Sequence, residues 1–70
     1  MIEMISVDSS WISEYGYDQA QAIVYVTFRK DGVRWQYRGV PPHVWQEFHL
    51  ADSKGRFIHA VLNTYDHGPA

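Results

Sequence analysis

The sequence predicts an α+β domain, an antiparallel β-meander of about three strands followed by two C-terminal helices packed on one face. Alternating apolar and polar residues in the first half predict the strands. Apolar residues at helical spacing between positions 43 and 65 predict the helices. The 70 residues suffice for a single domain (1–70), with its core over residues 4–65 and a flexible tail at 66–70.

The first strands differ in how clearly they are marked. Residues 4–7 are expected to form a short strand, and Ser9-Ser10 to form a turn after it. The segment Tyr15–Asp18 is aromatic but contains a glycine, so we expect a strand end or a loop there. Residues 22–28 are the clearest strand, because β-branched and aromatic residues alternate there with period two.

The pair Asp31-Gly32 predicts a tight hairpin, because both central positions of a type I′ turn need positive φ. Residues 33–38 alternate and form the second strand of that hairpin. A two-residue turn would pair Phe28 with Trp35 and Val26 with Tyr37, whereas a three-residue loop would change this register. The polar face of the hairpin collects Tyr25, Arg29, Arg34 and Arg38.

Two helices follow the hairpin. Proline suits the first helical turn, so Pro41-Pro42 is expected to start the helix over residues 43–51. Ser53 is a favourable N-cap for the second helix. The expected buried stripe of that helix is Phe57, Ile58, Val61, Leu62 and Tyr65.

Composition limits the classes of function. The net charge is −2, and all six Lys and Arg residues lie between positions 29 and 56, while the charges before them are all acidic. The absence of cysteine excludes disulfides and thiolate metal sites. No apolar run is long enough to span a membrane, and the N-terminus lacks the features of a signal peptide, so we expect a cytoplasmic protein.

Several short pieces of the chain, in this order and spacing, carry a family resemblance. They are Val7–Ile12, Tyr15–Asp18, Val24–Phe28, Gly32, Tyr37, Gly39–Pro41 and Ala51–Phe57. On these residues the chain resembles the KTSC domain family, a module found at the C-terminus of some lysyl-tRNA synthetases and as small bacterial and phage proteins. The resemblance implies RNA or nucleotide binding. The chain departs from the family at His59, where an asparagine is usual, and this leaves any role at that position open.

The segment Ser53-Lys54-Gly55-Arg56 is the candidate site. A helix start favours anions, and two cations with a capping serine and a flexible glycine fit a phosphate. Arg34 and Arg38 are candidate secondary contacts on the sheet. The alternative is an ordinary N-cap in a tight turn, with two solvated cations and a plain polar sheet face.

We therefore expect a small non-catalytic module that binds the phosphate backbone of RNA or DNA. No nucleophile–base pair is recognisable, and the four histidines match no metal motif, so we expect neither an enzyme nor a metal or other cofactor. The three tryptophans are interpreted as core or rim residues, one of which could stack on a base. The alternative function is a protein-interaction module, including a homodimer, that uses exposed aromatics such as Tyr15, Tyr17 and Trp45.

Overall fold

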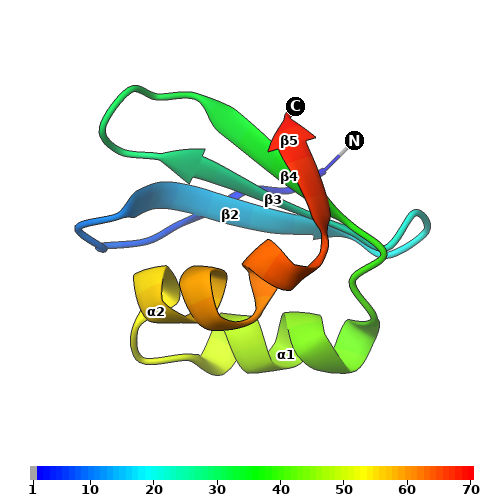
Figure 1. The fold of residues 1–70 in the computed structure, drawn as a ribbon. Coiled ribbons are helices and arrows are strands. Elements are labelled where there is room, and N and C mark those ends of the chain that lie inside the picture. Colours follow the sequence, from blue (N-terminus) through cyan, green and yellow to red (C-terminus); the bar gives the residue numbers. More distant parts are fainter. Residues whose placement is uncertain (1) are drawn as a thin grey trace.

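The computed structural model describes residues 2–70, and it consists of one sheet covered on one face by helices (Figure 1). The strands are β1 (Ile5–Ser6), β2 (Ile12–Asp18), β3 (Ile23–Phe28), β4 (Arg34–Arg38) and β5 (Asp66–Pro69). The helical elements are α1 (Pro42–Leu50), α2 (Lys54–Ala60) and the short 3₁₀ turn η1 (Leu62–Thr64). All neighbouring strands are antiparallel, in the order β1-β2-β3-β4-β5. The predicted α+β class is confirmed, but about three strands is too few for a five-stranded sheet.

The additional strands contain residues that weakened the sequence signal. Gly16 lies inside β2, and a Cβ there would be 2.8 Å from the carbonyl oxygen of Glu3, so the chain before β1 crosses closely over this position. Strand β5 lies where a flexible tail was predicted, and it pairs with β4 at the edge of the sheet. Gly68 and Pro69 within it are poor strand formers, and only an edge position accommodates this proline.

The hairpin between β3 and β4 has a longer loop than predicted. Val26 pairs with Trp35 and Val24 with Tyr37, a register two residues away from the expected one. The backbone N–H of Phe28 donates to Val33 O at 3.0 Å, which leaves the four residues 29–32 in the loop. Because side chains alternate with period two, a shift of two residues keeps the side chains of the paired strand residues on their predicted faces. Arg29, predicted on the polar face of the hairpin, lies in the loop instead.

Both helix starts follow the local signals. Pro41 precedes the first helical residue of α1 and Pro42 lies in its first turn. Ser53 caps α2, since its Oγ accepts a hydrogen bond from the Arg56 N–H at 3.3 Å. Helix α2 ends at Ala60, and the expected stripe continues through η1, whose Leu62 is fully buried. The buried core between sheet and helices is Ile12, Tyr15, Val24, Val26, Tyr37, Val40, Val44, Phe48, Ile58 and Leu62.

Candidate binding site

Lys54, the first residue of α2, forms hydrogen bonds within the domain. Its Nζ donates hydrogen bonds to the backbone oxygens of His49 and Ala51, both at 2.9 Å, and its side chain is only 9% exposed. The ammonium also lies over the rings of Tyr15 and Phe48, 5.3 and 5.7 Å from their centroids. It thereby satisfies carbonyls at the end of α1 that have no partner within the helix. Burial lowers the pKa of Lys54, and the charge of Asp52 opposes that shift.

Gly55 allows Trp11 to pack closely against α2. A Cβ at this position would lie 2.4 Å from Cδ1 of Trp11, well inside the contact distance of two carbons. The glycine therefore allows the indole of Trp11 to lie directly against the backbone of α2. The close approach predicted for a ligand at Gly55 is occupied by a side chain of the same chain.

The hollow beside the start of α2 is acidic. It has a volume of about 480 Å³ and lies between residues 7–11 and 51–54. Its lining residues include Asp8 and Asp52, while its single cationic residue is the buried Lys54. The residues that line this hollow therefore carry more negative than positive charge, which disfavours a phosphate. Arg56 is exposed, but it is not part of the lining.

The two candidate arginines of the sheet lie elsewhere. Trp35 and Tyr37 face the helices, so Arg34 and Arg38 lie on the opposite face. Arg34 forms an ion pair with Glu14 at 3.2 Å, and Arg38 forms one with Asp66 at 2.9 Å. The hydrogen bond from Arg38 lowers the pKa of Asp66. The structure therefore brings Ser53, Lys54, Gly55 and Arg56 together, but it does not bring Arg34 and Arg38 to them.

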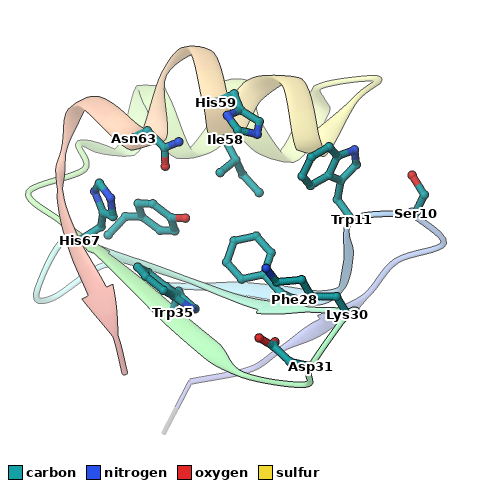
Figure 2. Close-up of a pocket in the computed structure, with 11 residues that line it drawn as sticks. Ser10, Trp11, Phe28, Lys30, Asp31, Trp35, Ile58, His59, Asn63 and His67 are labelled. Carbon is teal, nitrogen blue, oxygen red and sulfur yellow. The ribbon is translucent and has the colours of Figure 1, made fainter.

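A second hollow lies on the helical side of the sheet, and we call it the aromatic groove (Figure 2). It has a volume of about 640 Å³ and extends between the sheet and the α2–η1 segment. Many of its lining residues carry a ring. These are Trp11, Phe28, Trp35, Tyr37, His59 and His67.

The walls of the groove are formed by edge-on ring contacts. Trp11 is 51% exposed, and its ring meets that of His59 at 5.3 Å and 82°. Phe28 and Trp35 meet at 6.2 Å and 82°. In an edge-on contact only one of the two rings has a face covered by the other. His59, which stands where the family usually has asparagine, therefore lines the groove beside Trp11.

Tyr37 places an unpartnered hydroxyl in the groove. The residue is only 1% exposed, and among residues 2–70 no hydrogen bond joins its oxygen to another group. Tyr15 and Tyr17 differ, because their hydroxyls bond to His49 Nδ1 at 2.8 Å and Val40 O at 2.7 Å. In the part of the chain that the structure describes, no side-chain nitrogen or oxygen is both fully enclosed and unpaired, so the Tyr37 hydroxyl is not completely enclosed, and Tyr37 is one of the residues that line the groove. Burial raises the pKa of Tyr37, which keeps this hydroxyl protonated and able to donate.

His67 and Asn63 add polar groups to the same groove. His67 Nδ1 lies 2.7 Å from the backbone oxygen of Tyr65. Because a carbonyl oxygen only accepts, we assign the proton of neutral His67 to Nδ1, which leaves Nε2 as an acceptor. The imidazole stacks on Tyr37 at 5.2 Å and 28°. Asn63 is exposed on η1, and its side-chain amide has no hydrogen bond to residues 2–70.

Sequence reasoning missed this groove for an identifiable reason. It placed Trp11 and Trp35 at the core or rim, but it treated the segment that carries His67 as a tail. The sequence does not show that β4 pairs with a further strand, because this pairing exists only in the folded sheet.

The exposed aromatics predicted for an interaction surface are largely covered. Tyr15 is only 4% exposed and belongs to the core. Tyr17 and Trp45 stack on each other at 5.2 Å and 8°, and both are partly buried. These three residues therefore form a packing cluster between β2 and α1.

Among residues 2–70, no group of three or more His, Asp or Glu side chains is placed to hold a metal ion. None of the helices in this range has the length and apolar character needed to cross a membrane.

The fold and the groove define a small α+β domain with an antiparallel sheet, helices on one face and a ring-lined hollow between them. The KTSC domain family model matches residues 8–65. A protein of Tsukamurella paurometabola is 37% identical over 59 residues, 84% of this chain and 87% of that protein. A protein of Stutzerimonas stutzeri is 37% identical over 61 residues, 87% of this chain and 84% of that protein.

A solved structure agrees with these sequence matches. The crystal structure of a KTSC domain protein from Yersinia pestis has a TM-score of 0.92 to this chain at 34% identity. The match covers 100% of this chain and 99% of that one. The chain belongs to the KTSC domain family.

Proposed function

We propose that this domain is a non-catalytic module that binds single-stranded nucleic acid by stacking bases in the aromatic groove. One observation carries the proposal: two tryptophans, Trp11 and Trp35, line an open groove around an unpartnered tyrosine hydroxyl. Aromatic faces bind bases of any sequence, at about 1–3 kcal/mol per stacked base.

The charges support stacking over phosphate recognition. Lys30 lines the groove and is exposed, but Asp31 lies beside it in the same lining. Arg56 is an exposed cation on α2, and among residues 2–70 neither Lys30 nor Arg56 forms an ion pair. Contacts to one or two phosphates of a single strand give a slope of log K against log salt of about −0.7 to −1.4. We therefore expect a shallow salt dependence.

The distribution of tryptophans provides the test. Trp45 lies outside the groove, so a Trp45→Phe variant leaves only the two groove tryptophans as fluorophores. Short single-stranded RNA and DNA should quench this variant strongly, with the shallow salt slope given above. The matched variant, Trp11→Phe with Trp35→Phe, retains only Trp45 and should show little quenching.

Two results would count against the proposal. Equal quenching in both variants would place the nucleic acid outside the groove. No binding even at low salt would remove nucleic acid as the ligand and leave the groove to another partner.

A further inference from the structure

Three residues with polar side-chain groups line the aromatic groove on the side formed by β4, η1 and β5. They are Tyr37, Asn63 and His67. Figure 2 shows Asn63 and His67 at the end of the groove that Trp35 also lines. A planar ring that stacks on Trp35 at this end of the groove would lie beside these residues.

The three groups differ in how firmly their polarity is fixed. A hydroxyl rotates to donate or accept, and a side-chain amide offers both a donor and an acceptor. Only His67 is fixed, because the 2.7 Å bond from its Nδ1 to the Tyr65 carbonyl leaves Nε2 as an acceptor. The stack of His67 on Tyr37, at 5.2 Å, holds the ring in this orientation.

We propose that His67 makes the groove selective for bases that carry an exocyclic amino group, adenine or cytosine, over bases with a keto oxygen at that position. This inference rests on the proposed function. The amino N–H of adenine donates to His67 Nε2, whereas a keto oxygen would meet a second lone pair. The Asn63 amide can complete the recognition of adenine, since it pairs with an amino group and an adjacent ring nitrogen together. The Tyr37 hydroxyl supplies the remaining hydrogen bond at the floor of the groove.

The test compares two short uridine-rich RNAs that differ only in one central base, adenine or hypoxanthine. Hypoxanthine replaces the amino group of adenine with a keto oxygen and keeps the same ring size for stacking. The wild-type domain should bind the adenine RNA about tenfold more tightly, within the range for one well-placed base contact. Measured affinities by fluorescence titration give this ratio directly.

A pair of variants assigns the selectivity. His67→Phe keeps a ring over Tyr37 but removes the acceptor, so the ratio should fall close to one. His43→Phe changes an exposed histidine on α1, outside the groove, and should keep the ratio. Tyr37→Phe should weaken both RNAs, because it removes the hydroxyl while keeping the buried ring.

The possible failures are separable. Equal, intact affinity of the wild-type domain for both RNAs overturns the base selectivity and leaves the proposed function standing. A ratio that persists in His67→Phe overturns the role of His67. Binding of neither RNA overturns both proposals.

Discussion

In the structure, the start of α2 is closely packed, whereas the aromatic groove is open. In the sequence, the start of α2 resembles a binding site and the residues of the aromatic groove resemble a core. The start of α2 has the residue types of a phosphate site, yet Lys54 bonds to the end of α1 and Gly55 is covered by Trp11. The groove is lined by residues that resemble an ordinary core, yet Trp11 is 51% exposed and the Tyr37 hydroxyl has no hydrogen-bond partner among residues 2–70. Charge in a motif therefore indicates a ligand site only where the fold leaves that charge unpaired.

The two regions are physically linked through Trp11. Its indole lies on the backbone at Gly55 and forms one wall of the groove. Under the proposed function, the segment Ser53–Arg56 would contribute to binding indirectly, by positioning the Trp11 ring. The comparison gives three predictions about stability, each with a matched control.

The largest effect is expected from Lys54→Met, which keeps the apolar stem and removes the ammonium. Two carbonyls at the end of α1 would lose charge-assisted hydrogen bonds, and we expect a loss of about 2–3 kcal/mol in the free energy of unfolding. Arg56→Met, on the exposed side of the same helix, should change it by less than about 0.5 kcal/mol. Chemical denaturation of both variants makes the comparison, and equal small effects would show that the Lys54 bonds contribute little.

Gly55→Ala should destabilise the domain although helix propensity predicts the opposite. Replacing a helical glycine by alanine usually stabilises by about 0.5–1 kcal/mol, whereas overpacking costs about 1–3 kcal/mol. A Cβ 2.4 Å from the Trp11 ring makes packing dominate, so we expect a net loss of about 1–2 kcal/mol. Thermal or chemical unfolding provides the measurement.

A double-mutant cycle isolates the contact with Trp11. In a Trp11→Ala background the same glycine substitution should become neutral or stabilising, because the obstructing ring is gone. Gly68→Ala serves as a steric control, since nothing lies within 4 Å of a Cβ built there. The same loss from Gly55→Ala in both backgrounds would disprove the role assigned to the glycine.

The smallest effect distinguishes two tyrosines. Tyr17→Phe removes a 2.7 Å hydrogen bond to Val40 O and should cost about 1 kcal/mol of unfolding free energy. Tyr37→Phe should cost less than about 0.5 kcal/mol, because its hydroxyl has no partner among the described residues. A larger loss of unfolding free energy in Tyr37→Phe than in Tyr17→Phe would mean that the Tyr37 hydroxyl stabilises the fold.

Local chemistry made much of the fold predictable. Pro41-Pro42 and Ser53 mark the two helix starts correctly, because caps and first-turn prolines act through nearby backbone groups. The apolar face of the β3–β4 hairpin also follows from the sequence, although its register does not, because the loop contains four residues. Strand β5 required knowledge of the sheet edge, since Gly68 and Pro69 weaken its local signal.

The candidate site was less predictable because burial is a tertiary property. Nothing in the sequence around Lys54 shows that its ammonium lies over Tyr15, a residue far away along the chain. The groove likewise depends on β5, which carries His67 to the same hollow as Trp11. The sequence gives the residue types of the candidate site, but the contacts of these residues became visible only in the folded domain.

The most direct measurement of the central claim compares Trp35→Leu with Arg56→Met in RNA-binding titrations at fixed salt. Each substitution replaces a large side chain by a smaller apolar one. Of the two residues, only Trp35 lines the groove. We expect Trp35→Leu to weaken binding about tenfold or more through the loss of base stacking. Arg56→Met should weaken it by about twofold, as for one screened phosphate contact. A large loss in Arg56→Met with unchanged affinity in Trp35→Leu would return the binding site to the start of α2.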